Sequence, residues 1–241
     1  MLAQQTNVAP LNCTGHWAIY IQADEAIHEK VHAFLPSLME KYRNDDKVES
    51  LSLHRMNFFG DYKTFSAIDD LCVRIVKPHR FVLSRGDAAG FSVHPKYKER
   101  GRRITTVDSG VQLFHYLDLR SSDQRAAKHQ VALDLWHGDR NLTATEVEDR
   151  QYYVAYPRSF LSRFDGTHPA PMLDRVNRHC FVLDHDSPLL RTDLTACERK
   201  LLVRELLARH VSRSFRAGAA SSRLVGTETP PLAQDVPCAR A

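Results

Sequence analysis

The sequence predicts an α+β protein: a mainly antiparallel sheet with packed helices, a long C-terminal helix and a disordered C-terminal tail. Three observations lead to this prediction. Short apolar runs that alternate or are rich in β-branched residues recur between residues 16 and 119, as expected of strands. Apolar residues at helical spacing occur near both ends of the chain. Residues 217–241 are rich in Ala, Ser, Thr and Pro, which favours disorder.

The length of 241 residues allows one large domain or two small ones. We expect an irregular N-terminus at residues 1–14, a single globular domain over residues 15–216 and a disordered tail over residues 217–241. If the chain has two domains, residues 165–171 are the best boundary, because they contain one Gly and two Pro.

In the first third of the chain, His16–Ile21 predicts a strand. Asp24 then caps an expected helix that runs to about Arg43, in which Pro36 should cause a kink or an end. Val48–Met56 alternates like a second strand, whereas Phe65–Ile75 fits either a strand or a helix.

Two apolar runs, Phe81–Leu83 and Gly90–Val93, flank a turn at Arg85–Asp87 and predict a β-hairpin. Val111–Leu119 alternates strictly and predicts a half-buried strand.

The second half of the chain gives a weaker pattern. Short helices are expected at residues 124–130 and from Thr143 onward, strands at residues 131–136 and 180–183. The clearest helix spans about Ala196–Phe215 behind a capping box formed by Thr195 and Glu198. Its apolar stripe should close the core; the members of this stripe are Leu202, Val203, Leu206, Leu207, Val211 and Phe215.

The densest cluster of positive charge follows the hairpin, at residues 95–103. A rigid hairpin that presents a basic, glycine-containing loop offers backbone and side-chain donors to an anion. We therefore expect a basic cytoplasmic protein that binds an anionic polymer, most simply nucleic acid, with Tyr97 available for stacking. The predicted nucleic-acid-binding residues are Lys96, Tyr97, Lys98, Arg100, Arg102 and Arg103 in the loop and Arg204, Arg209 and Arg213 on the last helix.

The stretch Val93–Gly101, VHPKYKERG, resembles the acetyl-CoA pyrophosphate loop of GNAT-type acyltransferases, which reads roughly V-x-P-x-Y-R-x-R-G-x-G/A. The resemblance implies a strand that leads through this loop into an amphipathic helix, with acetyl-CoA bound at Val93–Arg103. Two features depart from the family pattern. Arg103 stands where the family has a small residue, and the β-branched segment Ile104–Val107 follows where the helix begins.

A second enzyme alternative is a zinc-dependent hydrolase, because residues 28–32 read H-E-x-x-H. This reading requires His28 and His32 on one face of an unbroken helix, with Glu29 as the base. No third ligand motif follows.

Asp184-His185-Asp186 comes after a predicted strand and could bind a metal ion or take part in acid–base chemistry. A turn before Pro188 is the simpler interpretation. A last alternative is a scaffold or regulatory protein with a protein partner, which predicts that the apolar stripe of the last helix is partly exposed.

Composition and the absence of known motifs argue against several classes of protein. No apolar run approaches the length of a membrane helix, and the first residues lack the pattern of a secretory signal. The five scattered cysteines suit free thiols in a reducing compartment. No P-loop, G-x-G-x-x-G or G-x-S-x-G motif occurs. The net charge of +4 is mild and favours anionic partners over basic ones.

Overall fold

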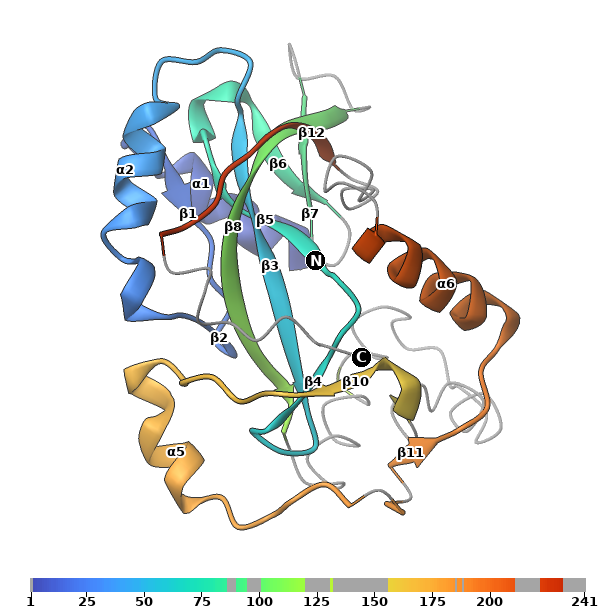
Figure 1. Ribbon diagram of the computed structural model, residues 1–241. Helices are drawn as coiled ribbons and strands as arrows, with labels where there is room; N and C mark the ends of the chain where they lie inside the picture. Colours follow the sequence, from blue (N-terminus) through green and yellow to red (C-terminus); the bar gives the residue numbers. More distant parts are fainter. Residues whose placement is uncertain are drawn as a thin grey trace.

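The computed structural model describes residues 2–85, 90–94, 101–119, 131, 156–184, 186–187, 189–210 and 222–231 (Figure 1). Residues 95–100, which contain most of the predicted basic loop, lie outside these ranges. The elements expected at 124–130, at 131–136 and from Thr143 also fall outside them, apart from Val131.

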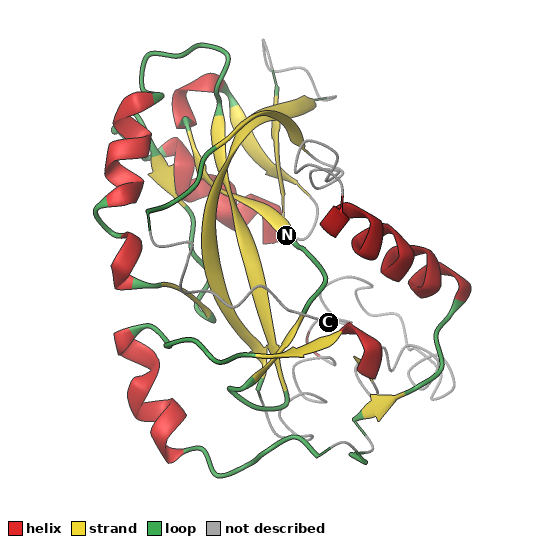
Figure 2. Cartoon of the chain, viewed as in Figure 1, coloured by secondary structure: helices red, strands yellow, loops and turns green. Residues whose placement is uncertain are grey.

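A large curled mixed sheet with helices around it forms the body, so the protein is α+β (Figures 1 and 2). Its main strand order is β1-β5-β3-β8-β7-β6. These strands are β1 Ala18–Ile19, β3 Ser50–Phe59, β5 Leu71–Val76, β6 Val82–Arg85, β7 Gly90–Val93 and β8 Arg102–Asp118. The strands off this path are β2 Glu25–Ile27, β4 Thr64–Ser66, β10 Leu161–Arg163 and β12 Ser222–Thr227. β9 Tyr156–Pro157 and β11 Leu190–Arg191 form a separate two-stranded sheet.

The two longest strands, β3 and β8, are parallel neighbours, paired from Ser50 opposite Thr106 to Phe59 opposite Asp118 with two shifts of register between them. Most strand pairs of the large sheet in the described residues are antiparallel, as expected, but the central pair β3–β8 and the pair β8–β12 are parallel, so the sheet is mixed. The chain between β3 and β8 forms β4 to β7, so it is long enough to return in the same direction.

The predicted hairpin is confirmed, because β6 pairs antiparallel with β7 from Val82 opposite Val93 to Arg85 opposite Gly90. The expected strand at Val48–Met56 corresponds to β3, and that at Val111–Leu119 to the second half of β8. β8 begins earlier than expected, at Arg102, since the β-branched run Ile104–Val107 continues the strand.

The helix expected from Asp24 is wrong in its first half. Residues 25–27 form β2 against β8, a 3-10 turn follows at Glu29–Val31, and the helix α2 spans only Phe34–Lys41. Pro36 therefore lies in the first turn of α2, where its missing N–H costs no helical hydrogen bond. Leu35 and Leu38 of α2 are buried against the largest apolar cluster of the sheet.

Residues 2–11, for which no regular element was expected, form the helix α1. The side chain of Asn7 accepts a hydrogen bond from the N–H of Ser84 at 2.7 Å and donates to its carbonyl at 3.2 Å. α1 therefore covers the edge strand β6 and satisfies its free backbone groups.

The expectation of a disordered tail is wrong for residues 222–231. Ser222 to Thr227 form β12, which pairs parallel with the first half of β8. The Glu228 carboxylate then accepts hydrogen bonds from Lys41 at 2.6 Å and from Tyr42 at 2.5 Å. Residues 232–241 lie outside the described part.

The helix α6 spans Ala196–His210, and residues 211–215 of the predicted helix lie outside the described part. Its capping box is confirmed: the Thr195 N–H donates to Glu198 at 2.9 Å and the Glu198 N–H donates to the Thr195 hydroxyl at 3.2 Å. The expectation that α6 closes the core is not supported in the described residues, since Val203 and Leu207 are 55% and 61% exposed.

The remaining short elements connect these parts. They are the helix α5 Leu173–Arg178 and the 3-10 turns at Pro78–Arg80, Arg158–Phe160 and Ala170–Met172. The strand expected at residues 180–183 is wrong, because Phe181 and Val182 are exposed and lie in no strand. None of the helices in the described ranges is long and apolar enough to cross a membrane.

Candidate functional site

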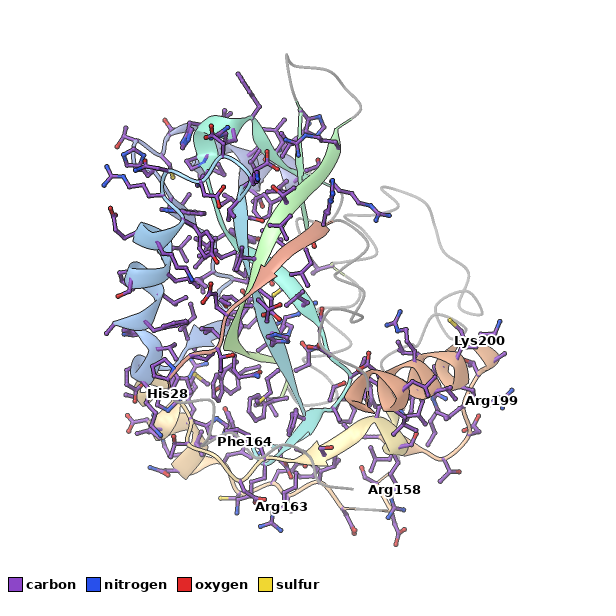
Figure 3. All side chains as sticks on the ribbon, turned by 45° about the horizontal axis from the view of Figure 1, so that its top comes forward. His28, Arg158, Arg163, Phe164, Arg199 and Lys200 are labelled. Atoms are coloured by element: carbon purple, nitrogen blue, oxygen red, sulfur yellow. The ribbon has the colours of Figure 1, made fainter. Side chains whose placement is uncertain are left out.

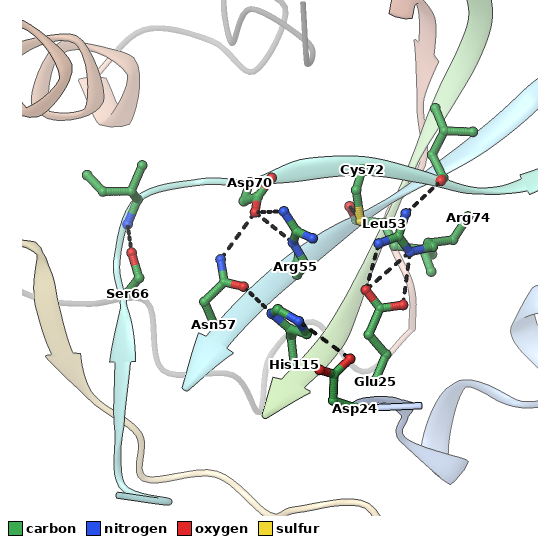
Figure 4. Close-up of polar contacts among 12 residues, drawn as sticks. Asp24, Glu25, Leu53, Arg55, Asn57, Ser66, Asp70, Cys72, Arg74 and His115 are labelled. Carbon is green, nitrogen blue, oxygen red and sulfur yellow. Dashed lines mark hydrogen bonds and ion pairs between the residues drawn. The ribbon is translucent and has the colours of Figure 1, made fainter. Parts of the chain in front are cut away.

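A row of polar side chains crosses one face of the sheet, over β5, β3 and β8 (Figure 4). Register places Glu25 of β2 opposite His115 of β8, and His115 opposite Asn57 of β3. Residues that face each other across neighbouring strands point to the same side, so these three side chains form a continuous line.

The deepest pair in the row is Arg74 with Glu25. Both side chains are fully buried, and the guanidinium is bidentate, with Nε at 2.9 Å and Nη2 at 2.7 Å from the two carboxylate oxygens. β5, which contains Arg74, and β2, which contains Glu25, are separated by β3 and β8 in the sheet. The pair therefore links β2 to β5 across the curled face of the sheet.

His115 belongs to a hydrogen-bonded chain with Asn57, Asp70 and Arg55. The Asn57 amide donates to Asp70 at 3.2 Å, so its oxygen faces His115 and accepts from Nδ1–H at 2.6 Å. Burial, aided by the nearby charge of Arg55, lowers the pKa of His115 to about 4. His115 is therefore neutral at pH 7, and its Nε2 holds a lone pair 3.7 Å from Asp24.

This arrangement allows His115 to accept a proton or a hydrogen bond, but the charges around it are already paired. Arg55 lies 2.6 Å from Asp70, and Arg74 is held by Glu25. No group of side chains in the described residues could hold a metal ion. The row is best explained as an internal network of polar contacts that holds β2 in place on the sheet.

A second buried group lies at His54 of β3. Its Nδ1 is 2.6 Å from Asp69 and its Nε2 is 2.8 Å from Asp108. Burial lowers the pKa of His54, but the hydrogen bonds to Asp108 and Asp69 outweigh it and raise the pKa to about 9. His54 is therefore an imidazolium between two carboxylates at neutral pH.

The candidate binding surface lies instead at the start of β8, which we call the basic end and define by Arg102, Arg103 and Arg223. β7 and β8 pair where the connection between them begins and ends: Val93 lies opposite Arg102, and Ser92 lies opposite Arg103. β12 adds Arg223, which lies opposite Thr105, two residues along β8 from Arg103. Arg103 and Arg223 are both exposed.

The third member of the basic end is already neutralised. Arg102 pairs with the buried carboxylate of Glu49 through both terminal nitrogens, one of them at 2.8 Å. Thr105 donates to the same carboxylate from its N–H at 3.0 Å and from its hydroxyl at 2.9 Å. Burial favours the neutral acid, but these contacts prevail and lower the pKa of Glu49. Arg102 thus offers less charge to a ligand than Arg103.

The other predicted binding residues are only partly described. Lys96, Tyr97, Lys98, Arg100 and Arg213 lie outside the described residues, as does the side chain of Arg209. Arg204 is exposed on α6, 3.8 Å from Glu205.

The sequence alone does not point to Arg223, because the composition of residues 217–241 predicts a disordered tail. The signal was weak: Leu224 and Val225 are the only consecutive large apolar residues near it, and Gly226 follows. A six-residue strand of this kind depends on its partner β8 rather than on its own propensity.

The resemblance to a GNAT loop finds no support in the residues that follow it. The family loop leads into a helix, whereas residues 102–118 form the longest strand of the sheet. Gly101 has a different role here. A Cβ at this position would lie 2.5 Å from Nε2 of His94, so the absent side chain lets His94 pack there.

The prediction that His28 and His32 share one face of an unbroken helix, which a zinc site would require, is also wrong. His28 lies in extended backbone before the 3-10 turn, and His32 follows that turn, so the two are not on one helical face. Nε2 of His28 is 2.9 Å from the Thr167 hydroxyl, and Nε2 of His32 is 3.3 Å from the Ile27 carbonyl.

Asp184 and Asp186 are exposed, and His185 lies outside the described residues. The Ser187 N–H donates to the Asp184 carbonyl at 3.1 Å, which is the turn expected before Pro188.

Comparison with known proteins gives no relative: no family model matches the chain, and no curated protein or solved structure is significantly similar to it. The functional argument therefore depends on the geometry of the described residues.

Proposed function

We propose that this protein binds an anionic polymer, nucleic acid in the first place, at the basic end of the sheet. The single observation that supports the proposal is the position of β12, which adds exposed Arg223, opposite Thr105, to the end of the sheet that contains exposed Arg103. Two guanidinium groups held on paired strands are a pre-organised site for phosphate groups.

The sequence between β7 and β8 adds further cations to this end, namely Lys96, Lys98 and Arg100, with Tyr97 available to stack on a base. Contacts of this kind recognise the phosphate backbone, so the proposed binding has little base specificity. Additional contacts from Arg204, Arg209 and Arg213 of the last helix remain a prediction.

The test compares charge reversal at the basic end with charge reversal elsewhere. Arg103→Glu/Arg223→Glu should weaken binding of single-stranded DNA or RNA at low salt by tenfold or more, measured by fluorescence anisotropy. The matched control is Arg175→Glu/Arg178→Glu, which makes the same change in net charge at two exposed residues of α5, near the end of the molecule opposite β12 (Figure 1).

Equal loss of affinity in both variants would show that only net charge matters. No binding by the unmodified chain at low salt would refute the proposal.

A second candidate function is a protein-interaction module. It is favoured by one observation, the exposure of Val203 and Leu207 on α6. The acyltransferase and zinc-hydrolase alternatives have no comparable support in the described geometry.

A further inference from the structure

We propose that the outward face of α6 is a docking surface for an acidic amphipathic helix of a partner protein. The outward face comprises Arg199, Lys200, Val203, Arg204, Leu206 and Leu207, all of them exposed. This inference does not depend on the basic end. It makes the second candidate function specific, and it assigns Arg204, one of the predicted nucleic-acid contacts, to a protein partner instead.

The orientation of α6 is fixed by its half-buried residues. Glu198, Leu201, Leu202 and Glu205 are the less exposed positions, and they recur at the three- and four-residue spacing of one helical face. This inward face differs from the predicted stripe, because Val203 and Leu207 lie on the other side of the helix.

Both acidic residues of α6 lie on the inward face. The Glu198 side chain is 14% exposed and pairs with Arg191 at 2.5 Å, and its pKa falls to about 2. The principal cause is the Arg191 hydrogen bond. The Glu205 side chain is 12% exposed, with Oε2 3.5 Å from the Asp69 N–H. The carboxylates of α6 are therefore directed to the body of the protein.

The outward face thus combines cations with apolar groups. Val203 and Leu207 are 55% and 61% exposed and lie one turn apart, in position to contact the same ligand helix. Arg199, Lys200 and Arg204 surround them, and Figure 3 shows Arg199 and Lys200 at the outer side of α6. Apolar groups at i and i+4 within a basic rim are the pattern of a helix that pairs with an amphipathic partner.

Charge decides between the possible occupants. A second copy of α6 would bring the three cations of each helix together, which is unfavourable. A nucleic acid would neutralise the cations but would leave Val203 and Leu207 in contact with water. A helix with Leu at i and i+4 and Glu beside them covers the apolar pair and neutralises the rim, so it complements both properties of the face.

The experiment uses the full chain and a designed helical peptide in which Leu repeats every three or four residues and Glu occupies the flanking positions. We expect saturable binding of the labelled peptide by fluorescence anisotropy. Val203→Ser/Leu207→Ser should weaken it at least tenfold, whereas Arg103→Glu/Arg223→Glu should leave it within twofold. A peptide with Lys in place of Glu should bind at least tenfold more weakly. The variant Arg103→Glu/Arg223→Glu separates this inference from the proposed function, because it changes only the basic end.

Other results would overturn the inference. These are no peptide binding, unchanged binding by Val203→Ser/Leu207→Ser, or equal binding of the acidic and basic peptides.

Binding to vesicles of anionic phospholipid with no binding of the peptide would assign the face to a membrane surface. Dimerisation in light scattering that is lost in Val203→Ser/Leu207→Ser would assign it to a second copy. If that variant fails to fold, Arg199→Glu/Arg204→Glu tests the same face through its charge, with the same tenfold loss expected.

Discussion

The Arg74 guanidinium lies in a fully buried environment, and in the described residues the carboxylate that neutralises its charge is that of Glu25. Two charges removed from water are tolerated only while they neutralise each other, so the loss of one leaves an uncompensated buried charge. Glu25→Gln should therefore lower the free energy of unfolding by roughly 3–5 kcal/mol, measured by urea denaturation.

The matched control is Asp165→Asn, which removes the carboxylate of the exposed Arg163–Asp165 pair. Exposed ion pairs contribute about 0–1 kcal/mol, so this variant should be nearly as stable as the unmodified protein. Equal destabilisation by the two substitutions would contradict the role assigned to burial.

His54 gives the protein a pH dependence with a defined sign. Its pKa is about 9 in the folded state and 6.5 in the unfolded chain, so folding favours the protonated form. The stabilisation is complete below pH 6.5 and is lost as the pH rises through 9; its size is on the order of 3 kcal/mol. His54→Asn should remove this decline in unfolding free energy between pH 6.5 and 9. Parallel stability curves for the two proteins would show that His54 is not the group responsible.

At the scale of elements, β12 stabilises the edge of β8 that the rest of the sheet leaves open. Truncation after residue 221 removes the ladder from Ser222 to Thr227 and the contacts of Glu228 with Lys41 and Tyr42. Since each hydrogen bond contributes about 0.5–1.5 kcal/mol and several are lost together, we expect a loss of at least roughly 3 kcal/mol. The melting temperature, measured by circular dichroism, should fall by at least roughly 6 °C.

A chain that ends after Pro231 keeps β12 and is the control for this truncation. It should retain the melting temperature of the full chain. The same melting temperature for both truncated chains would mean that β12 adds nothing to stability.

Local patterns predicted the elements that have strong signals of their own. The β6–β7 hairpin, β3 and the capping box of α6 follow from alternation, turn residues and paired side chains within a few positions. The parallel pairing of β3 with β8 and the addition of β12 are contacts between distant residues, and no local pattern specifies them. Only part of the basic end was predicted, for the same reason. Arg103 belongs to the predicted basic cluster, whereas Arg223 joins the basic end only because β12 pairs with β8.

Charge pairing explains a further limit of sequence reasoning. Arg102 and Arg103 are adjacent and chemically identical, yet only Arg102 is paired with Glu49. Such a distinction depends on the position of Glu49, immediately before β3, next to Thr105 of β8. A count of basic residues therefore overestimates the charge that is available to a ligand.

At the scale of the whole molecule, the two proposed binding surfaces lie on different elements. The basic end is formed by paired strands, whereas the outward face of α6 belongs to a helix that contributes no residue to the core clusters of the described chain. Residues 211–221 connect the end of α6 to β12, so the two surfaces are linked directly in the chain. Substitutions that affect one ligand and not the other are the means of separating them.

The salt dependence of nucleic-acid binding tests the central claim most directly. Each phosphate contact made by Arg or Lys adds about 0.7 to the slope of log K against log salt concentration for a single-stranded nucleic acid. Our account predicts that Arg103→Ala/Arg223→Ala reduces the magnitude of this slope by about 1.4 relative to the unmodified protein. An unchanged slope, or a slope near zero in the unmodified protein, would contradict it.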